Sequence, residues 1–181
     1  DMPDLFALNE KIGFPVALYE TVRELTAYLQ KYNTGLSLPE LVAAVLSPDV
    51  KEILEAAQGD QKIPEQVYQD AIHIYRPQLQ QMYADYFVSN KIDAIIYPTT
   101  PLTARPVGDD ETVELNGTRV PTFPSYVRNG FSSSNAGMPS LSIPAGLSTA
   151  GLPVGPQFYP QSRNQSCKTR RAPVVWAYDC R

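Results

Sequence analysis

Apolar residues recur every three or four positions along the first half of the chain, and this spacing places them on one face of a helix. Residues 14–32 show the pattern most clearly, and the polar and glycine positions 33–35 end it. Directly after them, Ser37 and Glu40 have the spacing of a capping box, in which the two side chains satisfy unpaired backbone amides. The pattern therefore predicts a layer of helices over about residues 1–90.

A serine and a proline at positions 47–48 predict a further helix start, because serine caps a helix and proline fits its first turn. A longer helical pattern follows over residues 64–90. Pro77 lies inside it, lacks an amide hydrogen and is expected to kink or split the helix near Arg76. His73, on the same stretch, is expected to pack on the helix or meet solvent, because the sequence shows no partner for a base or a pH switch.

The pattern changes to short apolar runs after residue 92. Residues 92–97 form a run that ends at Pro98, which is typical of a buried strand, and Asn116-Gly117 predicts a tight hairpin turn. The other expected strands are short and lie at residues 112–115, 118–120, 141–144 and 152–155. We therefore predict an α/β protein in which a helical layer, about residues 1–90, accompanies a few strands of a mixed sheet, about residues 92–159. So few strands leave the core incomplete.

The scarcity of histidine and cysteine narrows the chemistry. A Ser-His-Asp triad would have to use His73, the only histidine, and a zinc site of the usual kind needs more histidine and cysteine than the chain contains. The two cysteines, Cys167 and Cys180, close at most one disulfide and lack the spacing of a redox pair. Proline is abundant instead, with 17 among 181 residues. The composition thus gives no support to zinc, thiol or histidine-based catalysis.

The charge is divided unevenly along the chain. Residues 1–160 carry 10 Lys and Arg against 18 Asp and Glu, whereas residues 161–181 carry five Lys and Arg against one Asp. An acidic body does not favour nucleic acid, which binds clustered basic surfaces. We also expect no membrane partner, since no apolar run is long enough to span a bilayer. A cytoplasmic location is expected, since no signal-peptide pattern opens the chain.

Two polar clusters are candidates for chemistry. Residues 132–134 are three serines, one of which could serve as a nucleophile, but the sequence shows no base beside them. Their expected role is to cap a helix that begins near Asn135 or to form a pocket wall. Residues 109–111 are acidic and could bind a cation, but they lack the spacing of a calcium loop. We expect them to form a solvated loop.

Three segments of the second half resemble the C-terminal part of the amidase signature family. They are Asp93 to Pro101 (DAIIYPTTP), Asn135 to Gly146 (NAGMPSLSIPAG) and Gly151 to Gly155 (GLPVG). Other segments resemble the branch that contains mandelamide and indoleacetamide hydrolases, namely Phe14–Glu20, Ser47–Val50, Pro121–Phe123 and Arg128–Asn129. The resemblance covers about residues 10–157, and the order of its motifs makes it specific.

The resemblance implies a large α/β amidase with a Ser-Ser-Lys triad and arylacetamides as its substrates. In the family the triad lies upstream of the matched segments, so we expect no catalytic residue, no metal site and no cofactor in this chain. The resemblance implies a substrate-pocket wall, or equally a packing role, for Thr99, Thr100, Phe131, Asn135, Met138 and Ser140. The expected partner is a small amide substrate, and a homodimer of the full-length enzyme is left open.

The expected function is that of an amidase fragment which lacks the triad and is inactive alone. One alternative is a non-catalytic module that binds a small ligand or a protein, and another is a fragment of a glutaminyl-tRNA amidotransferase A-type subunit. Because the resemblance stops soon after Gly155, we divide the chain into an amidase portion, residues 1–160, and a basic tail, residues 161–181. The tail is expected to lie outside the fold.

Overall fold

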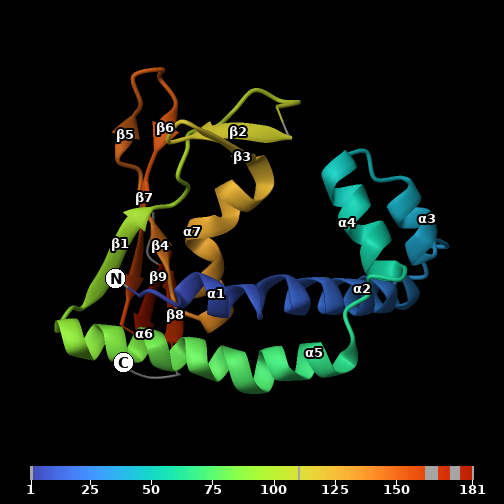
Figure 1. Cartoon of the computed structure of the whole chain (residues 1–181), viewed down its shortest axis with the longest axis horizontal. Helices are drawn as coiled ribbons and strands as arrows, with labels where there is room; N and C mark the ends of the chain where they lie inside the picture. The colour runs from blue at the N-terminus through green and yellow to red at the C-terminus, as the bar shows by residue number, and fades with distance from the viewer. Residues whose placement is uncertain (1, 110, 162–166, 172–175, 181) are drawn as a thin grey trace. The chain divides into compact units, whose positions relative to one another are not determined.

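The computed structural model describes residues 2–109, 111–161, 167–171 and 176–180 of the chain (Figure 1). The contacts divide the chain into two compact units. The helical unit comprises residues 4–78, and the sheet unit comprises residues 79–181 together with residues 1–3. Each unit has buried apolar residues of its own.

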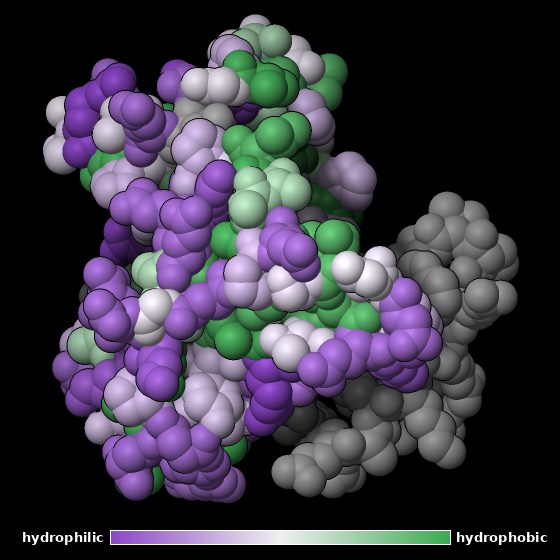
Figure 2. All heavy atoms as spheres, turned by 90° about the vertical axis from the view of Figure 1, so that its right-hand side faces the viewer, coloured by the Kyte–Doolittle hydropathy of each residue, from purple (hydrophilic) through white to green (hydrophobic). Residues whose placement is uncertain are grey.

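The helical unit confirms the predicted layer of helices. It contains α1 (Leu5–Glu10), α2 (Gly13–Lys31), α3 (Leu38–Ala43), α4 (Pro48–Gln58), α5 (Glu65–Asp70) and a π-helical turn, η1 (Ala71–Tyr75). A buried cluster of Leu29, Leu38 and Val42 joins α2 to α3. The cluster is stable because the apolar side chains on the inner faces of both helices are removed from contact with water. On the face shown in Figure 2, other hydrophobic residues reach the surface in a group surrounded by polar ones.

The capping box at the start of α3 is present as predicted. The Ser37 amide donates to Glu40 Oε2 over 2.8 Å, and the Glu40 amide donates to Ser37 Oγ over 3.4 Å. The Ser37 hydroxyl also donates to the same carboxylate. These hydrogen bonds favour the charged form and hold the pKa of the Glu40 carboxyl below its usual range.

Replacing Ser37 by alanine is expected to lower the free energy of unfolding by about 1 kcal/mol at neutral pH, because the Glu40 amide loses its acceptor and the Glu40 carboxylate loses the hydroxyl that donates to it. A carboxyl whose pKa is lowered by folding stabilises the fold above its unfolded pKa, and the effect fades as the pH falls through the lowered value. The loss is therefore expected to shrink in acid, as urea unfolding at several pH values would show. Glu40→Gln is the control, since it keeps an acceptor but does not titrate; an equal loss for Ser37→Ala at every pH would contradict the prediction.

The helix after Pro64 is interrupted where the sequence predicted it. A single π-helical turn, η1, separates α5 from α6 (Arg76–Asn90), so the change of helix type falls at Arg76. Pro77 follows at once, and it has no amide hydrogen to donate to a carbonyl one turn earlier. A π turn is one way in which a helix accommodates such a lost bond. His73 lies in this turn and is exposed, as expected.

The sheet unit is built around a three-stranded sheet in the order β1 (Ala94–Pro98), β7 (Pro156–Pro160) and β4 (Leu141–Ser142). Both pairings are antiparallel. One face of the sheet packs against α7 (Thr122–Ala136), and Gln80 of α6 donates to the Ala136 carbonyl at the end of α7 over 3.0 Å. The described part of the chain therefore contains helices, a small sheet and a partial core, which confirms the predicted α/β class.

Three two-stranded hairpins complete the sheet unit: β2 (Thr112–Leu115) with β3 (Thr118–Pro121), β5 (Gly146–Leu147) with β6 (Pro153–Val154), and β8 (Cys167–Arg171) with β9 (Trp176–Cys180). The first confirms the turn predicted at Asn116-Gly117. Both turn residues have positive φ, 53° and 80°, as a type I′ turn requires. The third hairpin lies in the basic tail, and the side chains of Cys167 and Cys180 are outside the described part of the structure.

Two predictions about the second half were wrong. β1 is not buried, because its residues alternate between half-buried and exposed and the side chain of Ile96 is 57% exposed. The three serines at 132–134 do not cap a helix near Asn135, because α7 runs without a break from Thr122 to Ala136 and contains them all. The hydroxyls of Ser132 and Ser133 have partners inside the helix or on neighbouring elements, and Ser134 is exposed, so all three are tolerated there.

Within the part of the chain that the structure describes, no helix is both long enough and apolar enough to cross a membrane.

Candidate functional site

A pocket of about 510 Å³ opens beside the end of β1. Three segments form it: residues 98–104, which begin at the last residue of β1; residues 142–144, which begin at the last residue of β4; and residues 153–155, which are β6 and the residue before β7. None of the side chains that line it carries a charge; they are proline, threonine, serine and apolar residues. The volume is within the range of small-molecule sites, and the lining suits an uncharged ligand with a few polar atoms.

Thr99 ties the pocket to the sheet. Its amide and its hydroxyl both donate to the Gly155 carbonyl, over 3.1 and 3.0 Å, and its Oγ1 lies 3.2 Å from Ser142 Oγ. A hydroxyl has one hydrogen and two acceptor positions, so Thr99 can accept from Ser142 while it donates to Gly155. Thr100 is turned the other way and donates to the Leu102 carbonyl over 2.7 Å. The threonines thus fix both the start of the loop and its first turn.

Two residues of α7 hold the same loop from its other side, and the sequence did not identify them as site residues. Asn129 Nδ2 donates to the Pro98 carbonyl over 2.8 Å, and the Tyr126 hydroxyl donates to the Thr103 carbonyl. Positions three apart on a helix lie on one face, so this spacing is the signal that could have linked them. Their contribution is to position the pocket wall.

The structure brings together two of the six predicted pocket residues. Thr99 and Thr100 line the pocket, whereas Phe131, Asn135, Met138 and Ser140 are half-buried and do not line it. The Ser140 hydroxyl accepts a hydrogen bond from Gln157 Nε2 over 3.0 Å, which ties the turn after α7 to β7. A role of these four residues in binding substrate stays a prediction.

The buried serines of α7 bond to tyrosines. The Tyr83 hydroxyl lies 2.8 Å from Ser132 Oγ, and the Tyr97 hydroxyl donates to Ser133 Oγ over 3.4 Å. Burial raises the pKa of both tyrosines, so the phenols stay protonated at neutral pH. Among the described contacts, neither serine has a lysine, histidine or carboxylate partner that could remove its proton. The cluster therefore serves the core rather than nucleophilic chemistry.

The described residues of the acidic loop before β2 do not form a cation site. Asp109 forms an ion pair with Arg105, four residues earlier, and Asp110 lies outside the described residues. Over the ranges that the structure describes, no three acidic, histidine or cysteine side chains are placed to hold a metal ion together.

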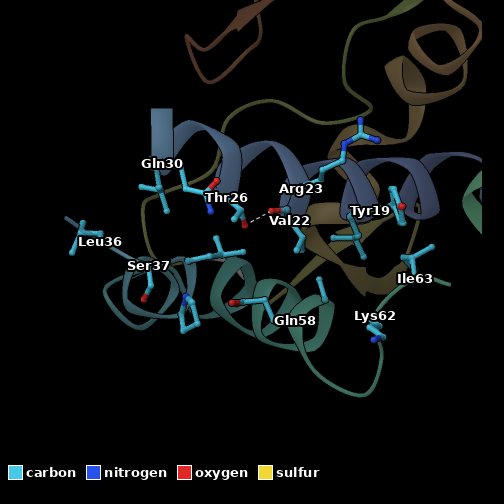
Figure 3. A pocket seen from close by; sticks show the side chains of 15 residues that line it. Tyr19, Val22, Arg23, Thr26, Gln30, Leu36, Ser37, Gln58, Lys62 and Ile63 are labelled. Carbon is cyan, nitrogen blue, oxygen red and sulfur yellow. Dashed lines mark hydrogen bonds between the residues drawn. The ribbon is translucent and has the colours of Figure 1, made fainter. Parts of the chain in front are cut away.

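A second pocket, of about 620 Å³, lies within the helical unit between α2, α3, α4 and the segment that precedes α5 (Figure 3). Its walls are mainly aliphatic. In Figure 3 the guanidinium of Arg23 points away from α3 and α4, consistent with its ion pair to Glu24 and its position 5.8 Å from the ring centroids of Tyr19 and Tyr68. No residue that the sequence predicted as functional lines this pocket.

Comparison with known proteins shows the family of this chain. A model of the amidase family matches residues 1–165, and the chain therefore belongs to the amidase family. The chain is 45% identical over 155 residues to an indoleacetamide hydrolase of Rhizobium radiobacter, which covers 86% of this chain and 33% of that protein. It is 39% identical to a mandelamide hydrolase of Pseudomonas putida, over 85% of this chain and 31% of that protein.

A solved amidase structure has a similar fold. It aligns with 87% of this chain and 32% of its own length, with a TM-score of 0.66 and 27% identity. The chain thus spans about a third of the length of the relatives it matches. The family predicted from the three C-terminal motifs is confirmed, and the match extends beyond Gly155 to residue 165.

Proposed function

We propose that this chain is a part of a carboxylic amide hydrolase that forms one wall of the substrate pocket and has no catalytic residues of its own. The observation that carries the proposal is the uncharged pocket at the end of β1, which lies within the region matched by the family. Relatives named as indoleacetamide and mandelamide hydrolases match this same region and support neutral aryl amides as the substrates.

The chemistry of the pocket wall fits such a substrate. Prolines and the side chains of Leu102, Ile143 and Val154 offer an apolar surface to an aryl or alkyl group. Hydroxyls of Thr99 and Ser142 retain acceptor positions toward an amide N–H. A charged substrate would find no opposite charge in this lining and would lose its hydration, which disfavours its binding.

The hydrolytic step needs groups that this pocket does not provide. An amide is cleaved by a nucleophile with an adjacent base, and by donors that stabilise the oxyanion. The pocket lining contains hydroxyls but no lysine, histidine or carboxylate. We therefore assign the nucleophile and base, a Ser-Ser-Lys triad, to the part of an amidase that this chain does not cover, and residues 161–181 to neither the pocket nor the triad. The cytoplasmic location and the homodimer stay predictions.

The isolated chain is expected to bind indole-3-acetamide or mandelamide without hydrolysing it. Ammonia release measures turnover, and chemical-shift changes in an NMR titration locate binding at residues 98–104 and 142–144. Val154→Trp is expected to abolish the shifts, because Val154 lines the pocket and a larger ring would fill it. Leu147→Trp is the matched control, since Leu147 is 70% exposed and does not line the pocket. Ammonia release by the chain alone, or binding that Val154→Trp leaves unchanged, would contradict the proposal.

A further inference from the structure

The pocket of the helical unit carries charge of one sign only. Its lining includes two basic side chains, Arg23 and Lys62, and no carboxylate, although acidic residues outnumber basic ones over residues 4–78. The pocket at the end of β1, in contrast, has an uncharged lining. A cleft lined by charges of one sign attracts ligands of the opposite sign. The two pockets are therefore suited to different ligands, and the pocket of the helical unit favours an anion.

Lys62 is the cation of this lining that is available to a ligand. The guanidinium of Arg23 already pairs with Glu24, over 2.9 Å. Within the described ranges, neither a hydrogen bond nor an ion pair engages the Lys62 ammonium, and Asp60, two positions earlier, is not bonded to it. The Lys62 amide donates to the Gly59 carbonyl over 3.2 Å, which fixes the backbone at this position between α4 and α5. An ammonium can donate three hydrogen bonds, so Lys62 can bind a carboxylate.

The rest of the lining suits a ligand with an apolar body. Figure 3 shows Lys62 and Ile63 at one end of the pocket, and Gln30 and Ser37 at the other. Between the two ends, α2, α3 and α4 contribute an aliphatic wall of Leu18, Val22, Leu29, Leu38 and Ala57. The volume of about 620 Å³ is within the range of small-molecule sites. An anion can place its charge at Lys62 while its apolar body is removed from water along this wall.

We propose that the pocket of the helical unit is a second binding site, which takes the aryl carboxylate that amide hydrolysis produces. Hydrolysis of a neutral aryl acetamide by water gives an aryl acetate and ammonium, so the reaction turns an uncharged group into an anion. The uncharged pocket at β1 suits the amide, and the basic pocket suits the carboxylate. The identity of the ligand rests on the proposed function, whereas the preference for an anion with an apolar body rests on the lining.

The experiment titrates the full chain with indole-3-acetate and follows the backbone amide signals by NMR. Saturable shifts are expected at residues 58–63 and along the part of α2 that lines the pocket, residues 18–30. Indole-3-acetamide has the same ring without the charge, so it measures what the carboxylate contributes. It should bind this pocket about threefold to fivefold more weakly, which is the effect of an ion pair at an exposed lysine.

Variants of Lys62 test the residue that the proposal names. Lys62→Glu should weaken the binding of indole-3-acetate by about tenfold, because it replaces an attracting charge by a repelling one. Lys62→Arg keeps the positive charge and should restore most of the affinity. Lys31→Glu is the matched control, since it makes the same change of charge on α2 at a residue that does not line the pocket. It should change the Kd by less than about twofold, because salt screens a charge at that distance.

Three results would overturn the proposal: no saturable shifts at residues 58–63, equal binding of indole-3-acetate and indole-3-acetamide in this pocket, or equal weakening by Lys62→Glu and Lys31→Glu. Circular dichroism of each variant shows whether the helices are retained, and Lys62 is exposed, so its replacement should leave them intact. The same titrations separate this proposal from the proposed function. If indole-3-acetamide does not shift residues 98–104 but indole-3-acetate still shifts residues 58–63, the proposed function is contradicted and the anion site stands.

Discussion

Replacing Tyr159 by alanine is expected to lower the free energy of unfolding by about 3–5 kcal/mol, the usual cost of removing a large aromatic side chain from a core. Tyr159 lies in β7 and is 1% exposed, and its ring stacks on that of Tyr97 with centroids 4.8 Å apart. Urea unfolding of the two proteins, followed by circular dichroism, measures the difference.

The phenol oxygen of Tyr159 provides the control for this prediction. Among the described residues it is buried without a hydrogen-bond partner, so Tyr159→Phe removes an unsatisfied group and is expected to stabilise the fold by about 1 kcal/mol. Tyr83→Phe is expected to do the opposite, because it leaves the buried hydroxyl of Ser132 without its partner at 2.8 Å. Equal losses for Tyr159→Phe and Tyr83→Phe would show that the Tyr159 hydroxyl is bonded.

The second large effect is expected at Gly155. A Cβ atom on this residue would lie 2.5 Å from the backbone carbonyl oxygen of Ile143, much closer than any real contact. The backbone cannot give way easily, because the Gly155 carbonyl also accepts two hydrogen bonds from Thr99. Gly155→Ala is therefore expected to cost about 3 kcal/mol, the upper part of the range for overpacking. Thermal unfolding followed by calorimetry measures this loss of stability. The backbone displacement that the added Cβ forces should also move the pocket wall at residue 155 and weaken amide binding there.

Gly130→Ala is the matched control for Gly155→Ala. A Cβ on Gly130 would meet the Tyr159 hydroxyl at 3.7 Å and Gln157 Oε1 at 3.9 Å, which are ordinary contacts. Gly130 also lies within α7, where alanine is the better helix former, so we expect a gain of about 0.5–1 kcal/mol. If Gly155→Ala is as stable as Gly130→Ala, the expected clash between a Cβ at position 155 and the Ile143 carbonyl does not occur.

Features that depend on a few adjacent residues could be predicted from the sequence. The capping box at Ser37 and Glu40, the type I′ turn at Asn116 and the break before Pro77 all follow from local hydrogen-bonding and backbone rules. The order of the motifs predicted the family in the same way, because residues 135–146 and 151–155 have sequences that are characteristic of it. Each of these predictions was confirmed.

Features that depend on distant neighbours could not be predicted. The apolar run at 92–97 predicts a buried strand, but burial depends on what covers a strand, and in the described sheet β1 has a neighbouring strand on one side only. The serines of α7 are predicted to be caps because the sequence does not show their tyrosine partners, Tyr83 and Tyr97, which stand 49 and 36 positions away. For the same reason the sequence did not show that Asn129 bonds to the Pro98 carbonyl, although its spacing from Tyr126 places the two residues on one face of a helix.

The prolines at the two ends of β7 restrict where insertions and deletions can be accommodated in the chain. Pro156 and Pro160 stand opposite Pro98 and Ala94, at positions that need no amide for the ladder with β1. A slip of one residue would put a proline where β1 requires a donor and would turn the Tyr159 ring away from α7. A shift of β7 by one residue in either direction is therefore excluded. Insertions and deletions must be absorbed in the connection between β4 and β7, where we expect members of the family to vary in length while the five residues of β7 keep their number.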